Sequence, residues 1–206
     1  MATDKITSAG LTEDIITGQP AASNIADDDL ILISDTGESA ALKKMTRANF
    51  VSGIGGANTP AFFANVSPSD QEVNNNTFTK IQFATEVFDT DGTYDHSTNY
   101  RWTPGATGKY IIGLGCWFYD AGDNIQSLVI SIYKNGSADS YFQTQIVGSD
   151  NRFQRFQMTA VHPIDVTSTS DYYEAYVRVN TADSNSASFN ASTNLRNYFY
   201  GYKLIT

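Results

Sequence analysis

The sequence predicts an all-β fold, a two-sheet sandwich that occupies about the last two thirds of the 206 residues. Aromatic residues make up 13% of the chain, and its polar residues are mainly Asn, Ser, Thr and Asp, a balance that favours strands and turns over helices. From Pro60 onward, strand-length runs alternate with turn residues at the spacing of a sandwich or barrel. Several runs also show the two-residue period of a strand.

Eight runs of strand length follow Pro60. In one of them Leu128, Ile130 and Ile132 would share a face, because alternate residues of a strand point the same way. Asn135-Gly136 follows and supplies a hairpin turn that needs positive φ. We therefore expect strands at Thr77 to Phe83, Tyr100 to Trp102, Lys109 to Phe118, Leu128 to Tyr133, Phe142 to Val147, Phe153 to Val161, Tyr172 to Val179 and Tyr198 to Leu204.

Residues 1 to 59 follow a different pattern. Residues 1 to 25 have no clear period and are rich in small and polar types, as expected of an extended arm. A small hairpin is predicted next, with strands at 30–34 and 41–45, and Thr46 can cap a short helix. Such a unit buries too little apolar surface to be stable alone, so we expect it to anchor on another chain through Leu30, Ile31, Leu32, Ile33, Leu42, Met45 and Phe50.

Composition excludes several classes of function. The formal net charge of -9 argues against nucleic-acid binding, which depends on Lys and Arg contacts to phosphates. The short basic group Lys43, Lys44 and Arg47 is interpreted as a solvated strand edge. No signal-peptide segment follows Met1 and no apolar stretch reaches the length of a membrane span, so we expect a soluble chain that contacts no membrane. The single cysteine, Cys116, lies in an apolar run and is interpreted as a small buried hydrophobe.

Few residues point to catalysis or to a cofactor. His96 and His162 belong to no metal-binding or nucleophile motif, and neither Cys-x-x-Cys nor Gly-x-Ser-x-Gly occurs. Asp89, Asp91 and Asp95 lie around a glycine as in a calcium loop, but the twelve-residue calcium pattern is absent and turn formation explains them better. We therefore predict no enzymatic activity, no catalytic residue, no cofactor and no metal.

Two alternatives stay open in the turn-rich segments. Asp120 with Asp123, or Asp171 with Glu174, could form the carboxylate pair of a glycan-cleaving enzyme, which is the most distant alternative. Three loops have the composition of adaptable recognition surfaces, and equally that of plain solvated loops, namely Asp120 to Gln126, Ser149 to Arg152 and Ala182 to Ser188.

Six short sequences occur in the order and spacing of a known family: Ala61-Phe62-Phe63-Ala64, Phe88-Asp89, Tyr100-Arg101-Trp102-Thr103-Pro104, Gly108-Lys109-Tyr110, Ile132-Tyr133-Lys134-Asn135-Gly136 and Phe199-Tyr200-Gly201-Tyr202-Lys203-Leu204. Together, residues 60–206 resemble the complement-component-1q-like head, the trimeric jelly roll shared with the tumour necrosis factor superfamily. The resemblance implies a two-sheet jelly-roll sandwich. The family commonly has Gly-Asp where this chain has His162-Pro163-Ile164-Asp165, so the end of that strand is left open.

The resemblance also implies a homotrimer. In this family the last strand faces the other two subunits, so Tyr198, Tyr200, Tyr202 and Leu204, or the neighbouring Phe199, should approach the three-fold axis. Strand alternation decides which set does so. An aromatic strand with little nearby charge is also unfavourable as a fully solvated surface. The alternative is that these aromatic residues only fill the core of the sandwich.

The amino-terminal unit carries a second, shorter resemblance. Its sequence Asp28-Asp29-Leu30-Ile31-Leu32-Ile33-Ser34-Asp35, followed by Leu42-Lys43-Lys44-Met45-Thr46-Arg47-Ala48-Asn49-Phe50, is similar to segments near the start of bacteriophage fibre and virion-decoration proteins. A small docking unit behind a mobile arm is what a surface appendage needs to attach its head to a larger particle.

The two resemblances imply a homotrimeric surface protein of a tailed-phage virion, assembled in the host cytoplasm. Residues 1 to 59 would attach it to capsid or tail proteins, and residues 60 to 206 would form the exposed head. As a capsid decoration, spike or cement protein it would stabilise the shell, and as a short tail fibre it would bind a host surface glycan or protein. The alternative is a free carbohydrate-binding or adhesin module.

Overall fold

The structure, a computed structural model, describes residues 26–35, 37, 41–52, 58–66, 69–148, 152–189 and 196–204. The chain divides into two compact units, Met1–Gly55 and Gly56–Thr206, and each is described by itself. The predicted arm lies outside the described residues. The predicted division after residue 59 and the independent folding of the two parts stay predictions. No helix in the described part of the chain is long and apolar enough to span a membrane.

The first unit contains the predicted hairpin and short helix. Strands β1 (Leu30–Asp35) and β2 (Ala41–Thr46) pair antiparallel, and helix α2 (Arg47–Ser52) follows directly. The predicted cap is confirmed, because the Thr46 hydroxyl accepts a hydrogen bond from the Asn49 amide at 3.3 Å. The helix start is tied back to the segment before β1, since the Arg47 amide donates to the carbonyl of Asp29 at 2.7 Å.

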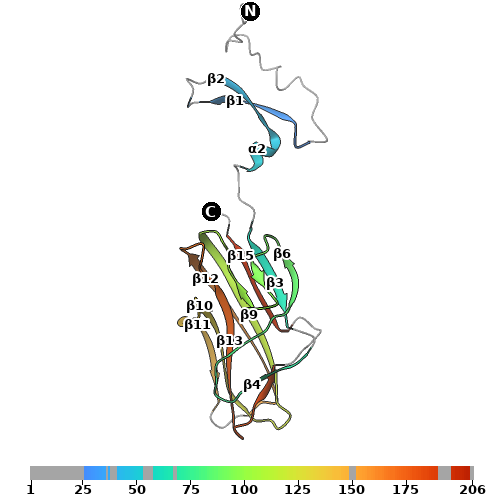
Figure 1. Cartoon of the computed structure of the whole chain (residues 1–206), viewed down its shortest axis with the longest axis vertical. Helices are drawn as coiled ribbons and strands as arrows, with labels where there is room; N and C mark the ends of the chain where they lie inside the picture. Colours follow the sequence, from blue (N-terminus) through green and yellow to red (C-terminus); the bar gives the residue numbers. More distant parts are fainter. Residues whose placement is uncertain are drawn as a thin grey trace, which may run out of the picture. The chain divides into compact units, whose positions relative to one another are not determined.

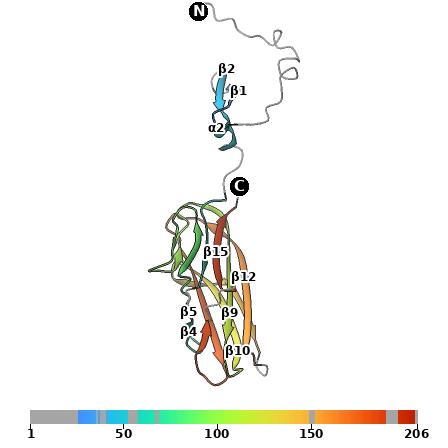
Figure 2. The same ribbon diagram turned by 90° about the vertical axis from the view of Figure 1, so that its right-hand side faces the viewer.

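The second unit is an all-β jelly-roll sandwich of two antiparallel sheets, as the sequence predicts (Figure 1). Figure 2 shows the sandwich from the side. Its strands are β3 (Ala61–Asn65), β4 (Gln71–Val73), β5 (Thr79–Lys80), β6 (Thr85–Asp89), β7 (Tyr94–Asp95), β8 (Arg101–Trp102), β9 (Gly108–Tyr119), β10 (Ile125–Lys134), β11 (Ser137–Val147), β12 (Arg155–Val166), β13 (Tyr173–Thr181), β14 (Ala187–Phe189) and β15 (Tyr198–Lys203).

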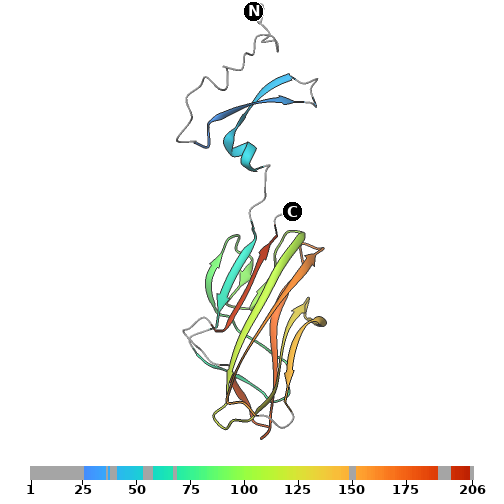
Figure 3. The ribbon, with the colours of Figure 1, turned by 180° about the vertical axis from the view of Figure 1, so that it is seen from behind.

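The larger sheet has the order β4-β14-β9-β15-β3-β6, and β12 pairs with the other side of β9. The C-terminal strand β15 lies between β9 and β3 and pairs with both, as the view in Figure 3 shows. Strand β12 pairs with β9 without interruption from Arg155 to Val166. This extends the predicted strand beyond Val161. Pro163 fits there because β12 is an edge strand, where a missing amide proton breaks no ladder hydrogen bond.

The smaller sheet has the order β11-β10-β13-β8-β7, with β5 paired to β13. The predicted turn between β10 and β11 is confirmed, because Asn135 and Gly136 have φ of 53° and 75°. The Asn135 side chain also donates to the Asp171 carboxylate at 3.0 Å, and Lys134 forms an ion pair with the same carboxylate at 2.8 Å. The hairpin is thereby fixed to the start of β13.

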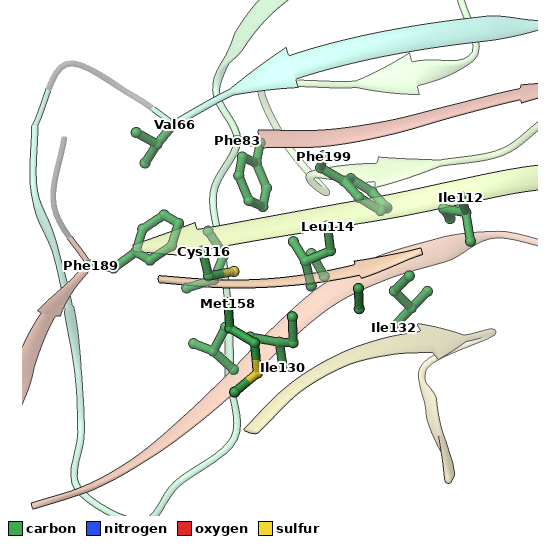
Figure 4. Packing of buried hydrophobic residues seen from close by; sticks show 14 of the residues in the cluster. Val66, Phe83, Ile112, Leu114, Cys116, Ile130, Ile132, Met158, Phe189 and Phe199 are labelled. Atoms are coloured by element: carbon green, nitrogen blue, oxygen red, sulfur yellow. The ribbon is translucent and has the colours of Figure 1, made fainter. Parts of the chain in front are cut away.

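The core lies between the sheets (Figure 4). Leu114, Cys116 and Phe199 project into it from the larger sheet, and Ile130 and Ile132 from the smaller one, and all five are fully buried. Burial raises the pKa of the Cys116 thiol, because the thiolate would lose its solvation. The interpretation of this cysteine as a small buried hydrophobe is confirmed.

An aromatic cluster fills one part of the core around Phe62. Its ring centroid lies 4.7 Å from that of Tyr94, 4.9 Å from that of Trp102 and 5.0 Å from that of Phe199. The Trp102 indole donates to the Thr93 hydroxyl at 3.0 Å, so its buried N–H is satisfied. The rings come from β3 and β15 of the larger sheet and from β7 and β8 of the smaller sheet, and the cluster therefore joins both sheets.

The short strands are the elements that sequence reasoning missed. It gave no strand at β3, β4, β6, β7 or β14, and it made the run Thr77 to Phe83 a strand throughout, whereas only β5 within it is one. Strand β6 has mostly exposed side chains and no apolar alternation. It is a strand because it pairs with β3, from which β4 and β5 separate it in the chain but which lies next to it in the sheet. Tertiary pairing, not local pattern, decides such elements.

Gly201 is required by the aromatic cluster. A Cβ atom added there would lie 2.5 Å from Cζ3 of Trp102, a ring that is completely buried and cannot move aside. We predict that Gly201→Ala lowers the free energy of unfolding by roughly 1–3 kcal/mol through overpacking. Urea denaturation followed by tryptophan fluorescence measures this change. An unchanged midpoint would contradict the assigned packing.

Candidate functional site

The strand β15 separates its side chains between two environments. Phe199 and Gly201 are buried on the core side, whereas Tyr198, Tyr200 and Tyr202 lie on the opposite side of the sheet and are half-buried. The alternation that the sequence left open therefore places the three tyrosines on the outer face and Phe199 in the core. Leu204 follows the strand and is also half-buried.

The register extends this outer face across five strands. Opposite Tyr200 lie Gly113 of β9 on one side and Phe63 of β3 on the other. Val161 of β12 pairs with Gly113, and Phe88 of β6 pairs with Phe63. The result is one continuous row of five paired residues, and the two at its ends, Val161 and Phe88, are 50% and 49% exposed.

Two further rows flank the first one. We call the three rows together the tyrosine face, and its remaining members are Thr159, Gly115, Tyr198, Asn65 and Thr85 in one row and Pro163, Ile111, Tyr202 and Ala61 in the other. No member of the face carries a charged side chain at neutral pH. An uncharged surface with several aromatic rings is a candidate site of interaction.

Two glycines of β9 allow the tyrosine rings to lie against the sheet. A Cβ atom on Gly113 would lie 2.2 Å from the Tyr200 ring, and one on Gly115 would lie 2.5 Å from the Tyr198 ring. Each ring thus occupies the space that a side chain of β9 would take. The rings are held flat over the strand, and this leaves a broad aromatic surface.

The rings on this face also contact one another. The Phe63 centroid lies 5.8 Å from that of Tyr198 and 6.3 Å from that of Tyr200, and both pairs are close to parallel. Tyr200 and Tyr202 are stacked at 6.4 Å, and Phe63 and Phe88 at 6.2 Å. Because each ring is restrained by its neighbours, little side-chain entropy would be lost when the face binds a partner.

The face is electrostatically neutral and weakly polar. Burial raises the pKa of the Tyr200 hydroxyl, with smaller contributions from the neighbouring hydroxyls of Tyr198 and Tyr202, so the phenol stays protonated. The Tyr198 and Thr159 hydroxyls lie 3.5 Å apart. The hydroxyl groups can therefore donate or accept hydrogen bonds in an interface without burying a charge.

The predicted anchor residues have mixed positions within the first unit. Leu30 is 61% exposed and Phe50 is 41% exposed, while Ile31, Ile33 and Met45 are half-buried. The side chains of Leu32 and Leu42 lie outside the described residues. No residue of helix α2 is buried, so this unit exposes apolar surface on its own.

Other residues of the tyrosine face were not predicted. Phe63 and Phe88 each belong to a segment that resembles the jelly-roll family, but the sequence did not indicate that either lies on this surface. The alternation of Phe62 and Phe63 across β3 could have indicated one inward and one outward ring. The position of Val161 beside Gly113 depends on strand pairing and has no local sequence signal.

The aspartates around Gly92 have roles in local turns. Among the described residues, no three His, Cys, Asp or Glu side chains converge as metal ligands would. Asp89 accepts a hydrogen bond from the Tyr94 amide at 2.6 Å, and Asp95 accepts one from the Thr98 amide at 2.8 Å. These aspartates fix turns. The Thr98 amide and further donors lower the pKa of the Asp95 carboxyl to about 2.

Residues of the two predicted carboxylate pairs bond to other groups of the chain. Glu174 forms an ion pair with Lys80 at 3.0 Å. Asp171 is bonded to Lys134 and Asn135, and these bonds lower the pKa of its carboxyl to about 2. A glycosidase needs one carboxylic acid with a raised pKa, so the Asp171 carboxyl is unsuited to that role. The other predicted pair contributes Asp120, whose carboxylate binds the Gly122 amide at 2.7 Å.

Comparisons with known proteins find distant structural similarity and no family. A scan against protein-family models finds no match, and a search of the curated proteins finds none. Similar solved structures include those of murine APRIL at pH 5.0, pH 8.5 and pH 8.0, which are 14%, 12% and 12% identical to this chain. Each covers 70% of this chain and 98% of the APRIL chain, with a TM-score of 0.47. Similarity of this extent carries no argument about the fold or the function of this chain.

We predict that Gly113→Ala displaces the Tyr200 ring from the sheet. The ring edge can swing outward, so the free energy of unfolding should fall by less than about 1 kcal/mol, unlike the change expected at Gly201. Once exposed, the Tyr200 hydroxyl should have a pKa nearer to the ordinary value for tyrosine. NMR titration of tyrosine-labelled protein measures that pKa, and a pKa that stays raised would show that the ring does not rest on Gly113.

Proposed function

We propose that this chain is a non-enzymatic structural protein that forms a homotrimer through the tyrosine face and is displayed on the surface of a tailed-phage virion. The observation that carries the proposal is the tyrosine face itself, an uncharged aromatic surface on the outer side of the larger sheet. A head that exposed it to water would leave a contiguous apolar patch unpaired.

A second copy of the same face is a suitable partner. Its rings can stack on rings, its hydroxyls can pair with hydroxyls, and no unpaired charge is buried. Interfaces of this kind are depleted of charge at the centre and enriched in tyrosine. The number of three copies follows from the resemblance of residues 60–206 to trimeric jelly-roll heads.

The first unit supports the attachment role. Leu30, Phe50 and Val51 are exposed apolar residues, and a hairpin with a six-residue helix has almost no core of its own. A partner that covered these side chains would stabilise the unit. The resemblance of this segment to phage fibre and decoration proteins makes a virion protein of the capsid or tail the proposed partner.

Two roles fit such an appendage. As a decoration, spike or cement protein it would stabilise the shell by bridging capsid subunits, and as a short tail fibre it would bind a host surface glycan or protein. A free carbohydrate-binding or adhesin module is the second candidate, because it would need only the head. As a virion protein it would be assembled in the host cytoplasm and act at the surface of the particle.

We expect Tyr200→Asp with Tyr202→Asp to dissociate the trimer. Two charges placed on the tyrosine face would have to be desolvated in the interface. The free-energy cost of this desolvation would exceed the stabilisation that the interface provides. Sedimentation velocity should then give the mass of one chain in place of three. The matched control is Tyr133→Asp with Tyr176→Asp, which changes two rings stacked at 3.8 Å on the outside of the smaller sheet and should leave the trimer intact. A wild-type mass of one chain would refute the trimer of the isolated protein.

We also expect deletion of residues 1 to 25 to leave the head folded while detaching it from the particle. The sandwich has its own core, so its circular dichroism and thermal midpoint should be unchanged. Mass spectrometry of virions purified after complementation measures incorporation. Normal incorporation of the shortened chain would contradict an anchoring role for this segment, and an unfolded head would contradict the domain boundary.

A further inference from the structure

An open cleft of about 340 Å³ lies where two turns of the jelly roll meet. One turn follows β9 and the other joins β13 to β14, and these are two of the three loops whose composition resembles a recognition surface. Residues of β4 and β14 of the larger sheet form a further wall of the cleft. Its lining consists of Glu72, Tyr119, Asp120, Ala121, Gly122, Asn124, Asp183, Asn185, Ser186 and Ser188.

Hydrogen bonds hold the two turns in a fixed arrangement. The Asn124 side chain donates to the Asp183 carboxylate at 2.8 Å, and the Ala182 amide donates to the carbonyl of Asn124 at 2.8 Å. Within the second turn, the Thr181 hydroxyl donates to the carbonyl of Asn185 at 2.6 Å. The cleft is therefore preorganised, and a ligand would not have to order it.

The lining has a consistent chemical character. Glu72, Asp120 and Asp183 offer carboxylate oxygens, which accept hydrogen bonds, while Asn and Ser side chains both donate and accept. Lys, Arg and His are absent from the lining, although the Arg155 guanidinium lies over the Tyr119 ring, 5.3 Å from its centroid. The half-buried Tyr119 ring adds an apolar surface at one wall. Acceptors around an aromatic ring suit a ligand with many hydroxyl groups and an apolar face.

We propose that this cleft binds a neutral saccharide of one or two units. Hydroxyl groups of the sugar would donate to the carboxylates of Glu72 and Asp183, and its C–H face would pack on Tyr119. The volume lies at the lower end of the range of roughly 300–1,000 Å³ for ligand sites, which fits a ligand of this size.

Competing ligands match the lining less well. An anionic sugar or a phosphate would face the three carboxylates of the lining, whereas the nearby Arg155 guanidinium lies outside the lining, over the Tyr119 ring, so binding of the anion would be opposed by like charge. A metal ion requires ligands that converge on one point, and no such group of three acidic, histidine or cysteine side chains is present in the part of the chain that the structure describes.

The position of the cleft agrees with a role in attachment. The chain enters the sandwich at Pro60, whose carbonyl accepts a hydrogen bond from the Lys203 amide at 3.2 Å. Strand β9 starts beside this end and runs the length of the sheet to Tyr119. The cleft thus lies at the end of the head opposite to the chain entry. This inference rests on the proposed role in surface attachment, but it does not depend on the number of subunits.

Ligand-observed saturation-transfer NMR on the full chain tests the inference. The probes are D-glucose, D-galactose, D-mannose and N-acetyl-D-glucosamine as neutral sugars, N-acetylneuraminic acid as an anionic sugar, and CaCl₂ as a cation. We expect at least one neutral sugar to bind saturably in the millimolar range and N-acetylneuraminic acid to bind at least tenfold more weakly.

Two variants with matched controls locate the binding. Tyr119→Ala and Glu72→Gln should each weaken it at least fivefold. Tyr172→Ala is the control for the first, because an arginine lies over each ring, Arg155 at 5.3 Å from Tyr119 and Arg101 at 4.4 Å from Tyr172. Glu86→Gln is the control for the second, since both glutamates are exposed strand residues with one hydrogen-bonded side-chain partner. Both controls should bind within twofold of the wild type.

Several results would overturn the proposal. These are the absence of saturable binding by all four neutral sugars, equal loss in the variants and their controls, stronger binding of the anionic sugar, or saturable Ca²⁺ binding at these residues without sugar binding. Sedimentation of the same samples separates this test from the proposed function. A trimer that binds no sugar removes the cleft inference alone, and a monomer that binds sugar removes the trimer alone.

Discussion

The register of β15 between β9 and β3 is the constraint on which the rest of the head depends. In this register Phe199 enters the core beside Phe62, and Gly201 leaves room for the Trp102 ring. A shift by one residue would turn the tyrosines of β15 into the core and Phe199 toward the outside, because alternate side chains face opposite sides. Gly201 helps to prevent this shift, since none of the neighbouring residues of the strand would fit against Trp102.

The same register creates the tyrosine face. Once Phe199 and Gly201 point inward, Tyr198 and Tyr200 must point outward, and they meet Gly115 and Gly113 on β9. Small residues beneath large rings give a flat surface that is apolar yet hydrogen-bonding, a combination that suits an interface more than a free surface. The core and the proposed interface are therefore two consequences of one strand pairing.

The head also separates its proposed tasks along its length. The chain enters beside the C-terminal end of β15, the tyrosine face covers the middle of the larger sheet, and the polar cleft lies where β9 ends. Short strands such as β4 and β14 are weak elements by themselves, but they form one wall of the cleft. Loops held by a rigid sandwich are a common position for recognition, because the strands supply the precision that loops lack.

The sequence by itself determined the all-β class, the long strands, the Asn135-Gly136 turn and the aromatic character of β15, because these depend on composition and on alternation between neighbouring residues. It also indicated the helix cap at Thr46. Only the tertiary structure decided which aromatic residues of β15 face outward and placed Val161 in their row. It alone brought the turn after β9 against the turn before β14. Such outcomes depend on pairing between strands that are distant in the chain, and the alternation within one strand does not identify the strand that pairs with it.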